Sequence, residues 1–347
     1  MNNRLEYIDA LRGITMILVV FAHVECFGFY KFGADTNVGD VFYLFRMPLF
    51  FFISGFVLIL TEKKIVNFDC WSSIKKKIRV LIIPTLILGL IYTYFKINED
   101  VTFFIENTAK SGYWFTLVSF EMFVIYYVIK KVFSKKYLGV LIGLSVAFVL
   151  LKLPMKLNET LCYIGNVTSF HYLFEYFQYF VFGVLISKSK EILDRSYIDK
   201  IVGLALILFI LLVYVKIGVV DSLTSNINYK VAETLLCIII GYLGIVVAFC
   251  AIRKYQDSFT NKTKAGKALQ YIGRRTLDIY LLHYFFLPTL PMVGDFFKEY
   301  PNMVLELTVG IVLSLLIIGV CLIVSNVLRT SDIIGYWLFG AKKIENK

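Results

Sequence analysis

Long apolar stretches recur along the whole chain, and only short polar stretches separate them. Most of the apolar stretches match the roughly 20 residues that a helix needs to cross a bilayer. Because the bilayer core offers the backbone no hydrogen-bond partners, such stretches form helices. The pattern therefore predicts an all-α fold, a polytopic transmembrane helical bundle of about ten spans, at residues 10–29, 41–60, 79–96, 113–129, 137–153, 170–187, 201–219, 231–251, 271–291 and 304–328.

The basic residues between these spans alternate from one connection to the next. Of the 36 Lys and Arg residues, 27 fall in one set of connections, which includes both ends of the chain, and 9 fall in the other set. Since Lys and Arg accumulate in cytoplasmic loops, the alternation predicts that both termini are cytoplasmic. The apolar segments run from end to end, so we expect a single transmembrane domain over residues 1–347 and no extramembrane domain.

Composition narrows the class further. Hydrophobic residues make up 59% of the chain, charged residues only 18%, and the net charge is +11. This charge is mostly loop charge that sets topology and contacts anionic lipid head groups, so we expect membrane lipids and no nucleic acid as partners. The six cysteines show no C-x-x-C spacing, and the three histidines lie on three different predicted spans, so no metal site is expected.

Three polar residues share one face of the first predicted span. Arg12 and His23 are eleven residues apart, and eleven steps of about 100° return to within roughly 20° of the start. Asp9 lies about 60° from Arg12 and could simply pair with it. Glu25 points about 160° away from His23 on a regular helix and is a poor partner for it unless the helix ends there. Charged groups inside a span usually mark function, which makes this face the first candidate site.

Polar residues also occur in later spans. Glu121 lies on the same face as Trp114, seven residues earlier, and within a membrane it needs a partner or a proton. Tyr280 and His283 are three residues apart and share a face of the ninth predicted span. Each of these residues could instead be a structural core residue whose polar atoms are hydrogen-bonded within the protein.

The second predicted span carries a compact motif. Pro48 suits the first turn of a helix, where its missing N–H is tolerated, and this places Arg46 just outside the span on the outer side. Ser54 and Gly55 form a patch of small residues suited to close helix packing, and Gly13 in the first span is suited to the same contact.

Charges also stand near the ends of the third and ninth predicted spans. Lys76 and Arg79 belong to a basic run at the cytoplasmic mouth of the third span, where they could serve as a topology signal alone. Asp278 could pair with Arg274, one turn earlier.

Together these motifs resemble the acyltransferase 3 family, bacterial membrane acyltransferases that O-acylate cell-surface sugars. The resemblance is carried by the D-x-L-R-G segment at residues 9–13, by the R-x10-H spacing that ends at His23, by the M-P-L-F-F-F-I-S-G run at 47–55 and by the I-Y-L-L-H run at 279–283. The Tyr-Trp-Phe segment at 113–115 and the Phe-Gly pair at 182–183 fit more loosely. Any one motif is weak, whereas their order and spacing together are fairly specific.

The resemblance implies group transfer across a bacterial cytoplasmic membrane. An acyl group, usually acetyl, would pass from acyl-CoA on the cytoplasmic side to a hydroxyl of a cell-surface polysaccharide or a lipid-linked glycan. Acyl-CoA is then the co-substrate, and no metal is required. Some family members carry a fused periplasmic domain, and we expect this chain to be of the stand-alone type.

The resemblance also implies roles for individual residues. By matching position His23 is catalytic, either as the general base for the hydroxyl or as the first acceptor of the acyl group. Asp9, Arg12 and Glu121 complete the expected catalytic set. Arg46, Ser54, Trp114, Tyr280 and His283 are expected to bind substrate.

The expected donor-binding residues are Lys76, Arg79 and Arg12. The family often shows R-x-x-R at the third span, and this chain departs from that pattern because Lys76 stands at the first position. Lysine offers a point charge where arginine would offer a two-pronged fork of N–H groups.

Two other functions fit a bundle with buried charges. A transporter or flippase for a glycan or a lipid-linked intermediate is the main alternative, although the two halves of the chain show no matching pair of broken spans. A membrane glycosyltransferase is the other, although the predicted outer loops are short for one. Dependence on acetyl-CoA separates the acyltransferase from both.

Overall fold

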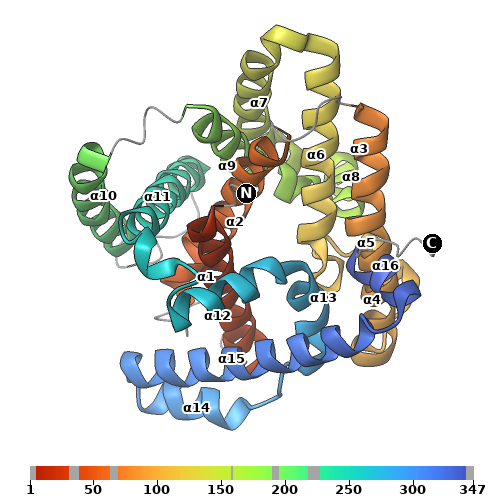
Figure 1. The fold of residues 1–347 in the computed structure, drawn as a ribbon, viewed down its shortest axis with the longest axis vertical. Coiled ribbons are helices and arrows are strands. Elements are labelled where there is room, and N and C mark those ends of the chain that lie inside the picture. The colour runs from red at the N-terminus through yellow and green to blue at the C-terminus, as the bar shows by residue number, and fades with distance from the viewer. Residues whose placement is uncertain are drawn as a thin grey trace. The chain divides into compact units, whose positions relative to one another are not determined.

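The computed structural model describes residues 5–30, 39–62, 69–157, 159–189, 195–217 and 227–340, and within these ranges it contains helices and no strands. The chain forms two compact units, which we describe separately. Unit 1 comprises Met1–Ile53, Ser189–Thr276 and Leu287–Gly319, and unit 2 comprises Ser54–Lys188, Leu277–Phe286 and Val320–Lys347. Figure 1 shows the helices and their labels.

Unit 1 is built from seven of the described helices or parts of them. It contains α1 (Glu6–His23), the first part of α2 (Gly39–Glu62), α10 (Arg195–Val215), α11 (Ile227–Lys254), α12 (Lys264–Arg274), α14 (Pro291–Glu299) and the first part of α15 (Met303–Leu328).

Glycine allows α1 and α12 to pack with their backbones in contact. A Cβ atom added to Gly13 would overlap the carbonyl of Leu269, and one added to Gly273 would overlap the carbonyl of Asp9. Small residues permit this approach between membrane helices. The sequence prediction of a close contact at Gly13 is therefore confirmed, and it fixes the helix that carries Asp9 against α12.

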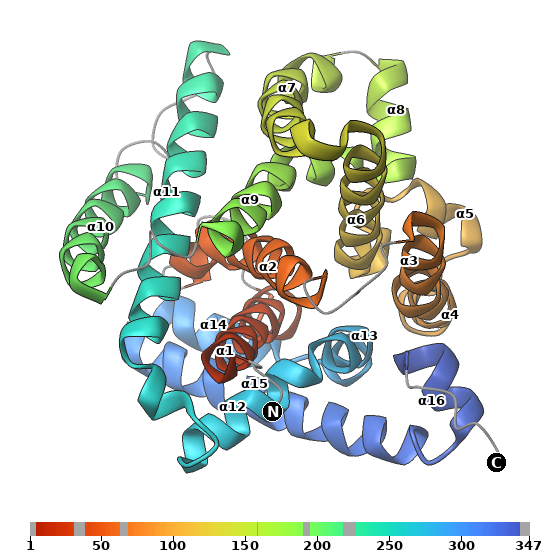
Figure 2. The same cartoon turned by 45° about the horizontal axis from the view of Figure 1, so that its top comes forward.

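The helices α10 and α11 lie side by side in both views of unit 1 (Figure 2). Phe209, Val213 and Ile240 form a buried hydrophobic cluster between them. The opposite side of α10 exposes large apolar side chains such as Ile207 and Ile210, as a surface that faces lipid would.

Unit 2 contains the remaining described helices. They are the second part of α2, α3 (Cys70–Lys77), α4 (Ile83–Tyr92), α5 (Val101–Glu106), α6 (Trp114–Phe133), α7 (Tyr137–Leu157), α8 (Glu159–Thr168), α9 (Phe170–Lys188), α13 (Thr276–Phe286), the last part of α15 and α16 (Asp332–Phe339). A π-helical turn, Ile78–Ile82, joins α3 to α4.

The second half of α2 packs tightly in unit 2. A Cβ atom added to Gly55 would overlap the carbonyl of Phe180 on α9, which confirms the predicted small-residue contact. At the end of α2, Glu62 accepts hydrogen bonds from Tyr126, at 2.8 Å, and from Lys130, at 2.6 Å. Glu62 thus joins α2 to α6 through a charged network.

The structure confirms an all-α, multi-pass membrane protein. Within the described ranges, six helical runs are long and apolar enough to cross a membrane, or seven if α13 and α14 count together as one span. The count of about ten spans, the cytoplasmic position of both termini and the single domain over residues 1–347 stay predictions. The six runs are Glu6–Gly28, Gly39–Glu62, Cys70–Ile97, Trp114–Lys152, Val231–Lys254 and Met303–Leu328.

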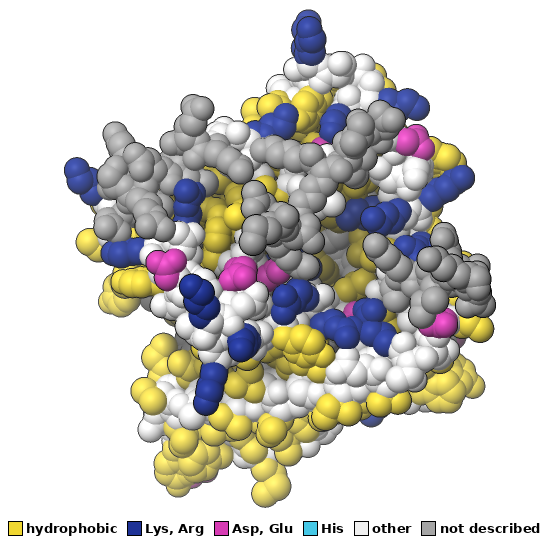
Figure 3. Space-filling view, viewed as in Figure 1, with side chains coloured by type: hydrophobic (Ala, Val, Ile, Leu, Met, Phe, Trp, Pro, Cys, Tyr) yellow, Lys and Arg dark blue, Asp and Glu magenta, His cyan; other side chains and the backbone are white. Residues whose placement is uncertain are grey.

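The surface agrees with a membrane environment. Hydrophobic side chains cover α14 and the first part of α15 along the lower edge of Figure 3. They include Met292, Phe296, Val304, Val312 and Leu316, all exposed.

Two predicted helix boundaries are wrong. Because α2 begins at Gly39, Pro48 lies inside the helix and not in its first turn, and Arg46 is a buried helical residue and not a loop residue. The predicted span 271–291 is not one helix, since α12 ends at Arg274, α13 ends at Phe286 and α14 starts at Pro291. The residues on both sides of each break are mostly apolar, so hydrophobicity along the sequence does not reveal where the helices end.

Candidate active site

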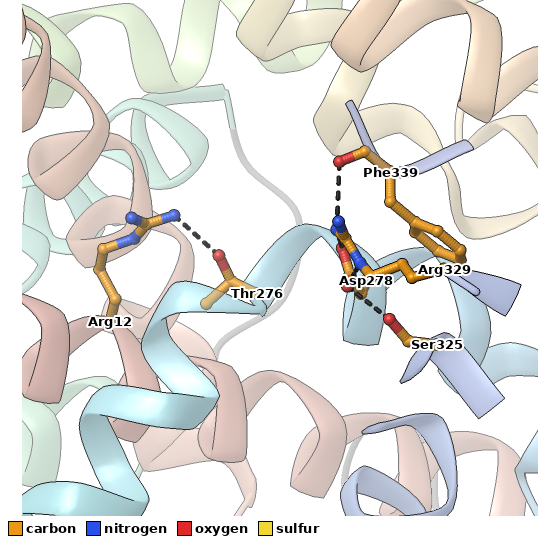
Figure 4. Close-up of polar contacts among 6 residues, drawn as sticks. All are labelled: Arg12, Thr276, Asp278, Ser325, Arg329 and Phe339. Atoms are coloured by element: carbon orange, nitrogen blue, oxygen red, sulfur yellow. Dashed lines mark hydrogen bonds and ion pairs between the residues drawn. The ribbon is translucent and has the colours of Figure 1, made fainter. Parts of the chain in front are cut away.

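The polar face of α1 is anchored in the first half of the helix. The Nη2 atom of Arg12 donates a hydrogen bond to the hydroxyl of Thr276, at 2.9 Å (Figure 4). Thr276 and Asp9 are both buried. This bond fixes the Arg12 guanidinium through a residue 264 positions later in the chain, a partner that helical periodicity does not reveal.

His23 stands where the winding of the first span changes. The α-helix ends at His23, and a π-helical turn, Val24–Gly28, follows directly. The imidazole is half-buried, and its ring centroid lies 5.8 Å from that of Phe27. Single π-helical turns inside α-helices occur frequently at functional sites. The structure therefore gives the predicted catalytic histidine an unusual local backbone, which the sequence did not indicate.

The π-helical turn also brings charges together in unit 1. Glu25 is almost fully buried, and its carboxylate lies where a Cβ atom on Gly39 would be, at the start of α2 as described. The N–H groups and the dipole at a helix start favour such an anion. Glu25, Asp40 and Arg46 all act electrostatically on the Cys26 thiol. Glu25 was not expected in the site because the spacing of a regular helix points it away from His23.

Arg46 is the predicted substrate-binding residue of α2. Its guanidinium carbon lies 4.6 Å above the ring of Tyr43, and only 6% of the residue is exposed. A stacked guanidinium keeps its N–H groups in one plane, at the edge, where they can meet a planar or anionic group.

In unit 2, α13 carries Tyr280 and His283 on one face, as predicted, and both side chains are buried. The Tyr280 hydroxyl donates to the carbonyl of Gly112, at 2.6 Å, and accepts from the N–H of Phe115, at 3.3 Å. Tyr113 returns a bond to α13 by donating to the carbonyl of Leu281, at 3.0 Å. These reciprocal bonds join α13 to the start of α6.

The His283 imidazole is bonded to its own helix. Its Nδ1 atom lies 3.1 Å from the carbonyl oxygen of Ile279 and 2.8 Å from that of Tyr280. Since both groups only accept, Nδ1 carries a proton. No surface of His283 is exposed, so the ring is enclosed within unit 2.

Trp114 heads a stack of half-buried aromatic rings in unit 2. The Trp114 and Tyr172 centroids are 4.0 Å apart with planes 24° apart, and Tyr176 continues the stack at 5.6 Å. Glu121 lies seven residues after Trp114 on α6. Its Oε2 atom is buried with no hydrogen-bond partner among the described residues. The predicted pairing of Trp114 and Glu121 on one helix face is consistent with this arrangement.

Lys110 is a buried cation, whereas the sequence pattern predicted a charge in a loop between two spans. Its ammonium donates to the carbonyls of Asn107, at 2.9 Å, and Asn166, at 2.8 Å, and also to that of Ile105. These carbonyls lie at the carboxyl ends of α5 and α8, where a positive charge is favourable. Burial lowers the pKa of Lys110 to about 8, and the nearby Glu121 carboxylate opposes this shift.

The predicted donor-binding residues lie on the helical run from α3 to α4. Lys76 is exposed in the last turn of α3, and Arg79 is half-buried in the π-helical turn that follows. The Arg79 guanidinium carbon lies 4.2 Å above the ring of Tyr336 on α16. Ser54, at the Gly55 contact on α2, is half-buried in the same unit.

The structure corrects the expected partner of Asp278. Arg274 is exposed, whereas the buried Asp278 carboxylate accepts two hydrogen bonds from Arg329, at 2.9 and 2.8 Å, and a third from Ser325 (Figure 4). A bidentate arginine is the stronger and more directional partner. Helix spacing suggested the local pair because it contains no information about a residue 51 positions away.

The predicted residues thus fall into two groups. Unit 1 holds Asp9, Arg12, His23 and Arg46, and unit 2 holds Ser54, Lys76, Arg79, Trp114, Glu121, Tyr280 and His283. Among the described residues, no group of three or more His, Cys, Asp or Glu side chains is placed to hold a metal ion.

Comparison of the chain with known proteins identifies its family. The chain is 24% identical over 314 residues to probable poly-beta-1,6-N-acetyl-D-glucosamine export proteins of Staphylococcus aureus strains MRSA252, MSSA476 and MW2, covering 82% of this chain and 80% of each relative. No solved structure matches it significantly. The acyltransferase domain family matches residues 5–325, nearly the whole chain. The protein is therefore a member of this acyltransferase family, as its motifs predicted.

Proposed function

We propose that the protein is a membrane O-acyltransferase of the bacterial cytoplasmic membrane. It moves an acyl group, acetyl in the simplest case, from cytoplasmic acyl-CoA to a hydroxyl of a cell-surface polysaccharide or a lipid-linked glycan. The observation that carries the proposal is the family match across residues 5–325, combined with a half-buried His23 at the point where α1 changes to π-helical winding.

His23 supplies the base in this proposal. Its imidazole takes the proton of the acceptor hydroxyl while the hydroxyl oxygen forms a bond to the thioester carbonyl carbon. The carbon–sulfur bond then breaks, and the coenzyme A thiolate leaves and takes up a proton. A positioned base contributes typically about 10²–10⁴-fold to such a reaction. Transfer through an acyl-histidine is the variant of this scheme in which the ring itself first receives the acyl group.

The charged residues of unit 1 support the chemistry of the donor. The bond that Arg12 donates to Thr276 keeps the guanidinium in one orientation, and a fixed cation stabilises the negative charge that develops on the thioester oxygen. The buried Asp9 lies one turn before Arg12 on the same helix. We assign Arg12 to the donor and Asp9 to keeping the polar face of α1 in place.

Unit 2 supplies the residues for the phosphates of the acyl-CoA donor. Lys76 and Arg79 are cations on one continuous helical run, and both suit the phosphates of coenzyme A. Glu121 stays in the catalytic set as a buried carboxylate with an unused acceptor atom.

The acceptor is assigned to aromatic and polar residues. The Trp114 stack offers flat apolar faces of the kind on which sugar rings pack, and Arg46 and Ser54 add polar contacts. The relatives are named for a polymer of N-acetylglucosamine, a sugar chain with free hydroxyls. Because Tyr280 and His283 are buried and bonded to backbone groups, we assign them to holding α13 in place and not to contacting the sugar.

Export is the second candidate function, because the relatives are named as export proteins. An exporter would move the sugar polymer across the membrane and would consume no acyl donor. Acyl transfer and export therefore differ in whether acyl groups from the donor end up in the glycan.

The test is an acyl-transfer assay on whole membranes. Membranes with and without the protein are incubated with acetyl-CoA that carries a radioactive acetyl group, and label is measured in the extracted surface glycan. The proposal expects label only where the protein is present, and alkali should release it as acetate because an ester is labile to base. Glycan that reaches the outer surface without any label would favour export instead.

A further inference from the structure

Residues 329–340 belong to unit 2 although the family match stops at residue 325. Arg329 lies just beyond α15, and its guanidinium donates to Asp278 and, at 3.1 Å, to the carbonyl of Phe339 (Figure 4). One arginine thus holds both the first turn of α13 and the last residue of α16. Because Asp278 is only 2% exposed, loss of Arg329 would leave a buried charge without its main partner.

The helix α16 also has well-defined ends. The Ser331 hydroxyl accepts from the N–H of Ile334 at its start, and Gly340 adopts a left-handed φ of 61° at its end. A Cβ atom added to Gly340 would press on the side chain of Val80, in the π-helical turn next to Arg79. The end of α16 therefore packs directly against the segment that carries a predicted donor-binding residue.

Tyr336 completes this contact. Its ring lies 4.2 Å below the Arg79 guanidinium carbon. The face of an aromatic ring attracts a guanidinium and restricts where it lies, and a guanidinium is well suited to bind phosphate. An arginine held in this way loses less side-chain freedom when it binds, which strengthens binding without adding a new contact to the ligand.

We propose that Tyr336 is a positioning residue for the acyl donor, which holds the Arg79 guanidinium ready for a phosphate of coenzyme A. The Asp278–Arg329 ion pair anchors α16 and so keeps the Tyr336 ring under Arg79. This inference rests on the proposed function, because it takes a coenzyme A phosphate as the group that Arg79 meets. It adds the segment 329–340, which lies outside the family match, to the donor site.

The experiment measures binding of coenzyme A itself to the full-length protein in lipid nanodiscs by calorimetry. Tyr336→Leu removes the ring, and its affinity should fall about fivefold, the loss expected for one cation–π contact. Tyr336→Phe keeps the ring and should bind within about twofold of wild type. In an Arg79→Ala background, Tyr336→Leu should cause no further loss, because the ring then has nothing to hold.

Ile333→Ala is the matched control, since Ile333 lies on the same helix and is 73% exposed. It should bind coenzyme A as wild type does, and the melting temperatures of all variants are compared in parallel. If Tyr336→Leu fails to fold, Tyr336→Met replaces it, because methionine fills the space flexibly.

Three outcomes overturn the inference. Tyr336→Leu could bind as tightly as wild type, Tyr336→Phe could be as weak as Tyr336→Leu, or the loss could persist in full without Arg79. In each case wild-type binding is intact, so the proposed function survives. A wild-type protein that binds no coenzyme A would refute the proposed donor and this inference with it.

Discussion

The helices α1 and α13 each carry a histidine in their last turn, and the two rings have opposite surroundings. His23 is half-buried, and a π-helical turn follows it. His283 is fully buried within a regular helix, and its Nδ1–H is committed to backbone carbonyls of that helix. A general base must reach the proton that it removes. Because both residues are histidines, the exposure of each ring is what distinguishes the candidate base from the buried ring.

The comparison also shows how polar groups are kept inside a bundle. On α1 the charged Arg12 donates a hydrogen bond to the hydroxyl of Thr276 on α13. On α13 the charged Asp278 accepts two bonds from one arginine and a third from a serine. Bonds of this kind between side chains far apart in the chain rigidify a fold.

The largest expected effect comes from the half-buried ring of His23. His23→Ala should lower acyl transfer to glycan by about 10²–10⁴-fold, because the reaction loses its base. Protein abundance in the membrane should stay unchanged, as measured by immunoblot alongside the labelled acetyl-CoA assay. Transfer within tenfold of wild type would remove His23 from the chemistry and with it the distinction between the two rings.

His283→Ala should act on stability instead. Deleting a fully buried ring leaves a cavity and should lower the free energy of unfolding by about 2–4 kcal/mol. The melting temperature of the purified protein measures this loss, while transfer per folded molecule should fall by less than about tenfold. A variant with wild-type melting behaviour but no transfer would show that His283 contacts the reacting groups after all.

The smallest expected effect is on the pH dependence of stability. It must be measured before a pH profile of acyl transfer is attributed to a histidine. Burial lowers the pKa of Lys110 to about 8 in the folded protein, from its ordinary value of 10.5. From pH 8 to 10.5 the unfolded chain therefore binds more protons, and stability rises with pH over this window. The wild-type melting temperature should gain roughly 2–4 °C relative to Lys110→Met between pH 7 and 10.

The control for Lys110 is Lys96→Met, at an exposed lysine of the same unit. That variant should keep the wild-type dependence of melting temperature on pH. Parallel curves for wild type and Lys110→Met would mean that the ammonium is as well solvated in the folded protein as in the unfolded chain.

Much of this arrangement could be predicted from the sequence because helix periodicity governs it. The shared face of Tyr280 and His283 and the close contacts at Gly13 and Gly55 follow from spacing and residue size alone. Family motifs gave the acyltransferase assignment, because their order along the chain is more specific than any one of them.

The remainder depends on contacts between helices, which spacing does not encode. Asp278 was given a local partner because Arg329 lies far along the chain. Arg46 was placed in a loop because the helix begins earlier than its apolar run, at Gly39. Lys110 looked like a loop charge because the carbonyls that bury it come partly from α8, 56 residues later.

The π-helical turn after His23 has a consequence for the lineage of this chain. Such a turn contains one residue more than an α-helical turn would need over the same rise. Removing a single residue within Val24–Gly28 would restore even α-helical winding and would leave the imidazole on nearly the same face relative to the residues just after the turn. A one-residue gap at this place in a sister sequence would therefore mark a protein that keeps the direction of its first histidine without the π-helical turn.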